Sequence, residues 1–173
     1  MKEKIKKQLL DNLSDTRFLE EYLYDLRKTN INEAIDACLD LLSSGDVQIQ
    51  GDAIWFIEML KPNSDKVIQS LKLLIHNTNL YIRTHSVVFL SERGVKNLIN
   101  ELYDVLHQDI DPQTRSRAAS SLLCYEEINK ISLLKELLVD SGSSIVWEAL
   151  IYLKNNPRFL EDSEIRHLFL ETE

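Results

Sequence analysis

Apolar residues recur at helical spacing along most of the chain, in short segments that each carry one apolar face. In residues 63–76, for example, Val67, Ile68, Leu71, Leu74 and Ile75 fall three or four positions apart. This period is typical of an amphipathic helix that packs one side against a core. No segment alternates apolar and polar residues over the length of a strand. The sequence therefore predicts an all-α fold without a sheet.

Short helices with one apolar side follow one another along the whole chain. The residues expected to point inward are Phe18, Tyr22 and Leu26; Ile31, Ala34, Ile35, Cys38, Leu41 and Leu42; Ile49, Ala53, Phe56, Ile57 and Leu60; Ile82, Ser86, Phe89 and Leu90; Val95, Leu98, Ile99, Leu102, Val105 and Leu106; Ile131, Leu134, Leu137 and Leu138; Ile145, Ala149, Tyr152 and Leu153; and Phe159, Leu160, Ile165, Leu168 and Phe169. Loops of about two to five residues separate these segments, so neighbouring helices are expected to run antiparallel.

Turn and capping residues predict where the helices begin and end. The expected N-caps are Ser14 or Thr16, Asn30 (with Glu33 in a capping box), Asp46, Asn63 or Ser64, Asn79, and Asp111 followed by Pro112 at the first helical position. The expected stops are Gly45 in the left-handed conformation, Pro62, Gly94 and the run Asn155-Asn156-Pro157. A further helix is expected from about Ser144.

One pattern repeats along the chain and is clearest at residues 111–122, DPQTRSRAASSL. Related segments start at residues 46, 79 and 142, so the steps between starts are 33, 32 and 31 residues. Each segment carries a small residue seven positions after its start, namely Ala53, Ser86, Ala118 and Ala149. A period of this size indicates a helical-repeat architecture, in which small residues let consecutive helices approach closely.

These segments resemble short HEAT repeats of about 30 residues. The third matches best, and the second keeps Arg83 but has Asn79 where the family has Asp; Gln50 and Val146 replace the arginine elsewhere, so a ladder of acids and arginines would be limited to Arg83 and Arg115. The resemblance implies a right-handed α-solenoid of about four antiparallel helix pairs in a single domain, 1–173. The expected parts are an N-terminal helical cap (1–29), repeats at 30–61, 62–94, 95–125 and 126–156, and a C-terminal capping helix (157–173).

Composition and charge restrict the kind of partner. The formal net charge is −8, and residues 30–61 carry six acidic residues against one lysine. Binding to nucleic acid depends on Lys and Arg, so a basic or mixed-charge protein partner is favoured over a nucleic acid. Solubility alone is the alternative explanation of the charge. No apolar run approaches the roughly 20 residues that a membrane helix needs.

The sequence carries no recognisable chemistry. His76, His85, His107 and His167 fall on different predicted helices, and no glycine-rich phosphate loop or nucleophile motif is present. His85 is expected to be a solvated surface residue. We therefore predict no enzyme, metal or cofactor. Cys38 and Cys124 are expected to be buried free thiols, and with the lack of a secretion signal they favour a cytoplasmic location.

The second helix of each predicted repeat is expected to line a concave binding face. Trp55 and Trp147 are predicted to point outward there, one near each end, and such residues are enriched in binding hot spots. The alternative is that each tryptophan packs sideways on a neighbouring helix. Asp52, His85, Arg117 and Glu148 share one aligned position and would add a mixed polar row to the same face.

An acidic stripe is the second candidate surface. Glu33, Asp36 and Asp40 fall on one side of the helix predicted in the first repeat, opposite its apolar side. Like charges repel there, so the stripe is either a binding surface or an ordinary solvated face.

The leading hypothesis is a non-catalytic protein-binding module, and its more specific form is an immunity or antitoxin-like protein that masks a basic toxin domain. A regulatory adaptor fits equally well. HEAT-like DNA glycosylases and bilin-lyase-like proteins are the alternatives that the resemblance suggests. Trp55, Trp147 and Asp52 would serve the glycosylase, but the acidic charge opposes it, and salt-dependent DNA binding would separate the two classes.

Overall fold

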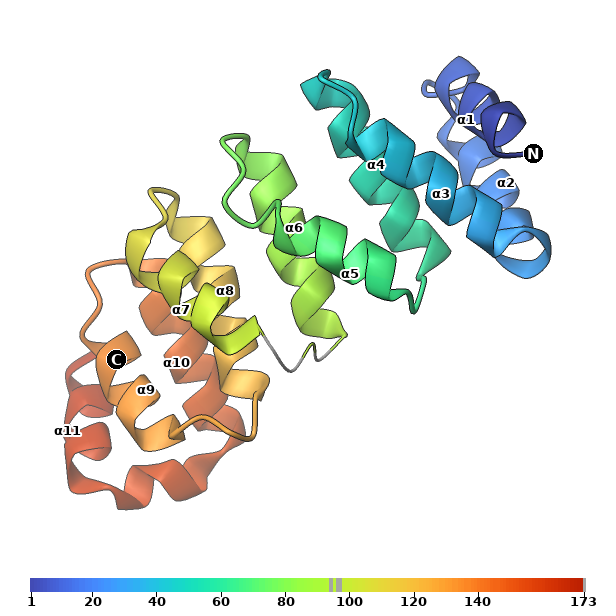
Figure 1. The fold of residues 1–173 in the computed structure, drawn as a ribbon. Helices are drawn as coiled ribbons and strands as arrows, with labels where there is room; N and C mark the ends of the chain where they lie inside the picture. The colour runs from blue at the N-terminus through green and yellow to red at the C-terminus, as the bar shows by residue number, and fades with distance from the viewer. Residues whose placement is uncertain (94, 96–97, 173) are drawn as a thin grey trace. The chain divides into compact units, whose positions relative to one another are not determined.

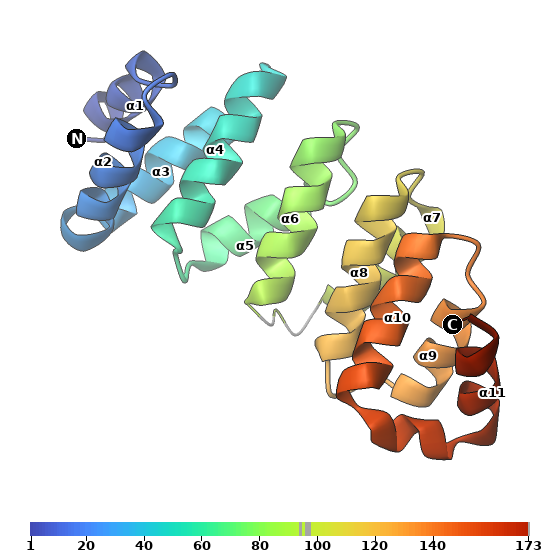
Figure 2. The ribbon, with the colours of Figure 1, turned by 180° about the vertical axis from the view of Figure 1, so that it is seen from behind.

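The computed structural model describes residues 1–93, 95 and 98–172, and these residues are helical almost throughout (Figures 1 and 2). Helices account for 78% of the structure, with no strand among the described residues, so the all-α prediction is confirmed. The predicted stop at Gly94 lies outside the described residues. No helix in the described part is long and apolar enough to span a membrane.

The chain divides into two compact units, residues 1–89 and 90–173. The first contains α1 (Lys2–Asp11), α2 (Thr16–Thr29), α3 (Ile31–Leu42), α4 (Val47–Leu60), α5 (Asp65–Lys72) and most of α6 (Leu80–Glu92). Within it, α1 packs on α3, α2 packs on α3 and α4, and α3 packs on α4 and α5. The two N-terminal helices thus cover α3 and α4.

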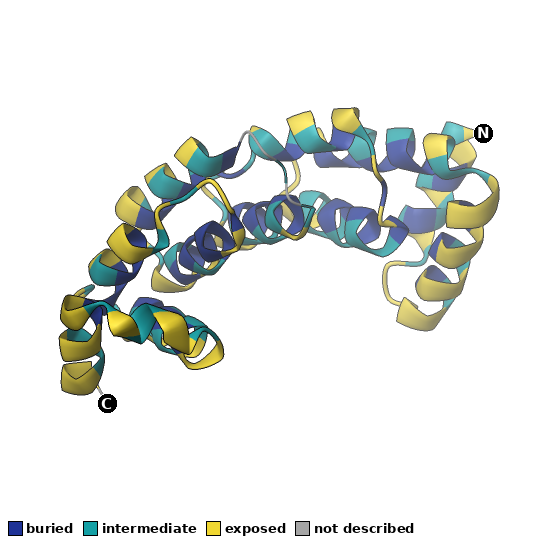
Figure 3. Cartoon of the chain, turned by 90° about the horizontal axis from the view of Figure 1, so that it is seen from below, coloured by how far each residue is buried: buried dark blue, intermediate teal, exposed yellow. Residues whose placement is uncertain are grey.

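The second unit contains α7 (Ile99–Gln108), α8 (Pro112–Cys124), α9 (Lys130–Leu138), α10 (Ser143–Asn155), the 3-10 helix η2 (Pro157–Glu161) and α11 (Ser163–Thr172). Helix α8 packs on α7, α9 and α10; α9 also packs on α10 and α11, and η2 packs on α10 and α11. Buried residues lie on the sides of the helices that face a neighbouring helix, as the dark blue segments of Figure 3 show. Each unit therefore has a core made from the apolar faces that the sequence predicts.

The predicted caps form where an aspartate or asparagine precedes the second helix of a repeat. The Asp46 carboxylate accepts hydrogen bonds from the backbone N–H groups of Gln48 and Ile49, at 2.8 and 3.1 Å. Asn79 and Asp111 cap α6 and α8 in the same way. These side chains satisfy N–H groups that the first turn of a helix leaves without an intrahelical acceptor.

Three other predictions about helix ends are wrong. Asp15, rather than Ser14 or Thr16, caps α2 by accepting a hydrogen bond from the Phe18 N–H at 2.9 Å. Asn30 is the N-cap of α3, but its side chain makes no capping hydrogen bond, so the capping box does not form. Gly45 does not take a positive φ, because α3 already ends at Leu42, with Ser43 as its C-cap.

The loop before the second helix has the same hydrogen bond in three repeats, a feature that was not predicted from the sequence. Two residues before each helix cap, the side chain of Asn77, Asp109 or Asp140 accepts a hydrogen bond from the cap's backbone N–H; the donors are Asn79, Asp111 and Gly142, at 2.8, 2.8 and 2.6 Å. Such turns, in which an Asn or Asp side chain bonds two residues ahead, fix the path of the loop. The repeat period is therefore visible in the loops as well as in the helices.

The two repeat arginines tie the same loops to the helices that follow them. Arg83 donates to the Thr78 carbonyl at 3.1 Å, and Arg115 donates to the Asp109 carbonyl at 2.8 Å. Both of these hydrogen bonds run to backbone carbonyls of the preceding loop. The arginine of the repeat thus holds the loop against the first turns of its own helix.

The predicted core is largely confirmed. Ala53, Ser86, Ala118 and Ala149, the small residues of the repeat, are all fully buried. Several residues that were predicted to point inward are only half-buried, namely Ile31, Ile49, Ile68, Leu74, Val95, Ile99, Tyr152, Phe159, Leu160, Leu168 and Phe169. The predicted inward side itself is wrong at Ile131, which is 40% exposed, and at Cys124, which is exposed. It is also wrong at Phe18 and Tyr22, which are half-buried and stack on each other while Leu19 and Leu23 fill the core. In each case the true inward stripe lies one or two residues from the predicted one.

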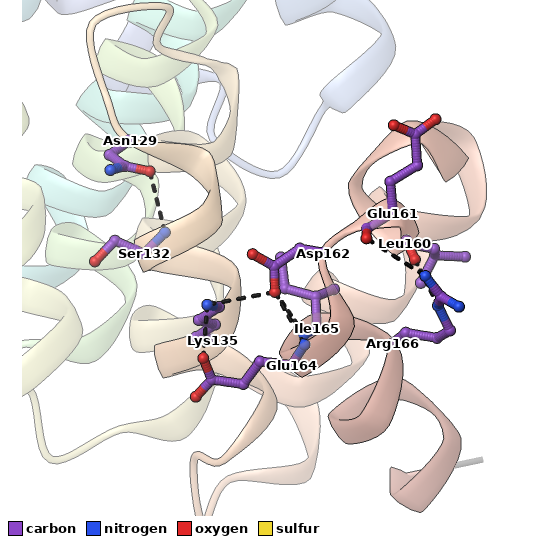
Figure 4. Close-up of polar contacts among 9 residues, drawn as sticks. All are labelled: Asn129, Ser132, Lys135, Leu160, Glu161, Asp162, Glu164, Ile165 and Arg166. Atoms are coloured by element: carbon purple, nitrogen blue, oxygen red, sulfur yellow. Dashed lines mark hydrogen bonds and ion pairs between the residues drawn. The ribbon is translucent and has the colours of Figure 1, made fainter.

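The predicted C-terminal helix over 157–173 is interrupted. Asp162 separates η2 from α11 and caps α11, accepting from the N–H groups of Glu164 and Ile165 at 3.1 Å each. It also pairs with Lys135 of α9 at 3.3 Å, and Lys135 contacts Glu164 at 2.6 Å (Figure 4). Arg166 donates to the carbonyls of Leu160 and Glu161, as Figure 4 shows. The contacts of Lys135 hold α11 against α9, and those of Arg166 hold it against η2.

Candidate functional site

An apolar surface with a hollow lies between α10 and α11. On α10, the side chains of Trp147 and Ile151 are 61% and 40% exposed. The hollow has a volume of about 690 Å³ and is lined by Trp147, Leu150, Ile151 and Lys154 from α10 and by Phe169 and Thr172 from α11. Large apolar residues that cluster in the open around a concavity are typical of a binding surface.

The exposure follows from the sequence of α10, which is apolar on two sides. Ile145, Ala149 and Leu153 are fully buried against the rest of the second unit. Trp147, Leu150, Ile151 and Lys154 lie three or four residues apart, so they form a separate stripe on the same helix. A helix with two apolar sides has more apolar surface than its neighbours in this unit cover.

In two other repeats, the residue equivalent to Trp147 faces a neighbouring helix. Gly51 stands at the equivalent position in α4, and a Cβ atom there would lie 3.5 Å from the Tyr81 ring of α6. Ser116 stands there in α8 and hydrogen-bonds to α10. The position therefore faces the second helix of the following repeat, which differs from the predicted concave face.

Trp55 does not share the exposure of Trp147. It is half-buried on α4, with its ring centroid 5.6 Å from that of Phe56. The exposure predicted for both tryptophans is therefore found at Trp147, whereas Trp55 is half-buried and its ring lies beside a residue of its own helix.

Three of the four residues in the predicted polar row have partners close by, namely Asp52, His85 and Glu148. In the first unit, His85 Nδ1 lies 2.9 Å from Glu58 Oε1, and the imidazole packs on the Tyr81 ring at 4.0 Å between centroids. Asp52 accepts a hydrogen bond from Gln48 at 3.3 Å, and partial burial raises the pKa of its carboxyl group. The prediction of a solvated His85 is wrong, because α4 supplies Glu58 as a partner.

The other half of the row lies in the second unit. Arg117 is exposed on α8, and Glu148 of α10 accepts a hydrogen bond from Ser116 at 3.1 Å. Glu148 is therefore engaged in the contact between α8 and α10. Arg117 keeps its predicted exposure.

The acidic stripe is partly neutralised by lysines from neighbouring helices. Asp40 lies 2.8 Å from Lys2 of α1, and Asp36 lies 3.4 Å from Lys66 of α5; Glu33 is half-buried. The hydrogen bond from Lys2 lowers the pKa of the Asp40 carboxyl group. The sequence pattern of one helix could not show these cations, which come from other elements. The stripe is therefore a weaker candidate than the apolar surface on α10.

No group of three or more His, Cys, Asp or Glu residues in the described ranges could hold a metal ion. Burial raises the pKa of the Cys38 thiol to about 12, so this side chain stays protonated in the core. Comparison of the chain with protein-family models and with curated proteins finds no match. Function is therefore inferred from the surface of the molecule itself.

Proposed function

We propose that this chain is a HEAT-like α-solenoid of antiparallel helix pairs and acts as a non-catalytic protein-binding module. The period of 31 to 33 residues, the buried small residue in each repeat and the repeated loop construction support the architecture. The apolar hollow beside Trp147 carries the functional proposal, because a side chain of this size is rarely left 61% exposed without a partner.

The proposal has a more specific form, an acidic immunity or antitoxin-like protein that neutralises a toxin in the cytoplasm. The net charge of −8 supports a basic or mixed-charge partner, and the two free cysteines are compatible with a reducing compartment. A regulatory adaptor would use the same surface. The two roles are distinguished by what the bound partner does once it has been identified.

Nucleic-acid chemistry of the glycosylase kind is the competing proposal. The observation that favours it is the raised pKa of Asp52, which lies one helical turn from Trp55 on α4. Binding of a DNA duplex that weakens steeply between about 50 and 200 mM salt would support it. The acidic balance of residues 30–61 opposes it, since five other carboxylates and one lysine surround Asp52 in this part of the sequence.

The protein-binding proposal is tested by site-specific photo-crosslinking in host lysate. A benzophenone amino acid replaces Ile151 in the hollow or, as a matched control, Ile131 on α9, which is also 40% exposed. We expect one protein to crosslink from position 151 and not from 131, and to be lost when Trp147→Ala is added. Equal capture from both positions would contradict the proposal.

A further inference from the structure

The second helices of successive repeats in the second unit lie side by side with their first turns in contact. Ser116 Oγ of α8 lies 3.3 Å from the Ser144 carbonyl oxygen of α10, and Ser144 Oγ lies 3.3 Å from the Pro112 carbonyl oxygen. Because the beginnings of both helices meet, α8 and α10 run in the same direction (Figure 2). This contact shows how one second helix receives the next.

The face of α8 that receives α10 has an equivalent on α10, 31 residues further on. Ser116, Ala119 and Leu123 of α8 are 7%, 0% and 4% exposed. Their equivalents are Trp147, Leu150 and Lys154, and these three line the hollow. The three equivalent positions are therefore buried on α8, whereas on α10 they line the hollow and carry larger side chains.

Among the described residues after α10, α11 continues the series of first helices, and a further second helix is not among them. Helix α11 packs on α9 and is held there by the contacts of Lys135 with Asp162 and Glu164 (Figure 4). It supplies Phe169 and Thr172 as one wall of the hollow, and α10 supplies the remaining lining residues. In the described part of the second unit, the hollow lies where the next second helix would pack.

From this relationship we infer that the hollow receives an amphipathic α-helix of the partner protein, lying parallel to α10 as α10 lies parallel to α8. The inference rests on the proposed function and specifies the element that binds. Its apolar side chains recur at i, i+3, i+4 and i+7, since this spacing matches a helical groove. Lys154 is the charged residue among those that line the hollow, so an acidic side chain on the docked helix lies opposite it.

A random library of 16-residue peptides, displayed on phage, tests the inference on the full chain. Selection is run in parallel on wild type, on Ile151→Arg, which puts a charge into the hollow, and on Ile131→Arg, which puts the same charge on α9 at equal exposure. Synthetic copies of the enriched peptides are then titrated against Trp55→Phe protein, in which Trp147 is the remaining tryptophan. Both arginine variants are first checked for wild-type helicity by circular dichroism.

We expect peptides with helical apolar spacing and an acidic residue to be enriched on wild type and Ile131→Arg and at least tenfold less on Ile151→Arg. They should shift Trp147 emission to shorter wavelength, and a central proline should abolish the shift. Enrichment of extended or proline-rich peptides that depend on Ile151 would overturn the helix while leaving the protein-binding function intact. Peptides that ignore Ile151→Arg, or no enrichment, would overturn the inference.

Two further results distinguish a failure of this inference from a failure of the proposed protein-binding function. If the emission of Trp147 shifts with protein concentration in the absence of peptide, a second copy of this chain fills the hollow, and the inference of a different partner fails. If photo-crosslinking from position 151 also captures no protein, the proposed function falls together with the inference.

Discussion

Ser116 and Trp147 occupy equivalent positions 31 residues apart, yet one is closed by a helix and the other is open. The Ser116 hydroxyl contacts the Ser144 carbonyl and the Glu148 carboxylate of α10 and is 7% exposed as a residue, whereas Trp147 is 61% exposed. The same position of the repeat is therefore packed against a neighbouring helix in α8 and exposed on the surface in α10.

This difference predicts that replacing Ser116 costs far more folding stability than replacing Trp147. Ser116→Trp would force a large ring between α8 and α10 and should lower the free energy of unfolding by about 1–3 kcal/mol. Trp147→Ser removes an exposed side chain and should change stability by no more than about 0.5 kcal/mol. Urea unfolding followed by circular dichroism measures both, and equal costs for the two variants would show that Trp147 is packed in solution.

The cap of α8 provides a second prediction. Asp111→Ala removes the carboxylate that accepts from the Thr114 N–H at 2.7 Å, and it should cost about 0.5–2 kcal/mol of unfolding free energy. Asp104→Ala on α7 is the control, because it removes the same charge from an exposed position in the same unit. Losses of similar size in both variants would assign the effect to charge rather than to capping.

The two cysteines should differ sharply in reactivity. Cys38 is fully buried with a thiol pKa of about 12, and Cys124 is exposed, so a disulfide reagent at pH 8 should modify one thiol per native chain. Mass spectrometry should place the label on Cys124, and Cys124→Ser should abolish rapid labelling. Rapid labelling of Cys38 in the native protein would indicate that the α3 core opens readily.

Much of the fold could be predicted from sequence because the information is local. The side chains of Asp46 and Asp111 cap the helices that immediately follow them, and Pro62 lies directly after Lys61, the C-cap of α4. Helix α4 ends with Lys61 in the left-handed conformation, at φ 48°. The sequence predicts this conformation for Gly45, at the end of the preceding helix, where it does not occur. Local patterns thus locate a boundary more reliably than they assign the residue that makes it.

The candidate site was harder to predict because it depends on what packs against each helix. Trp55 and Trp147 look alike in the repeat pattern, but their exposures differ in the structure. The acidic stripe failed for the same reason, since Lys2 and Lys66 reach Asp40 and Asp36 from other elements. A repeat pattern shows which residues share a face, and only the packing shows whether that face is covered.

The charge on Asp162 should make the attachment of α11 depend on pH. Backbone hydrogen bonding from Ile165, followed by the contact with Lys135, lowers the pKa of this carboxyl group below its ordinary value of 3.8. A carboxyl group whose pKa is lower in the folded state stabilises that state above the unfolded pKa, and the contribution is lost as the pH falls through the folded pKa. Asp162→Asn keeps a side-chain acceptor for the cap but removes the charge.

We therefore expect Asp162→Asn to have a lower Tm than wild type at pH 7, and we expect the two values to converge as the pH falls below about 3.8 toward 2.5. Asp140→Asn is the matched control, because the side chain of Asp140 also accepts a hydrogen bond from a backbone N–H in this unit, that of Gly142 at 2.6 Å. Thermal unfolding by circular dichroism from pH 7 to pH 2.5 gives both differences. A Tm difference for Asp162→Asn that is constant across this range would contradict the role of the charge, because the neutral carboxyl group could then replace the carboxylate without loss.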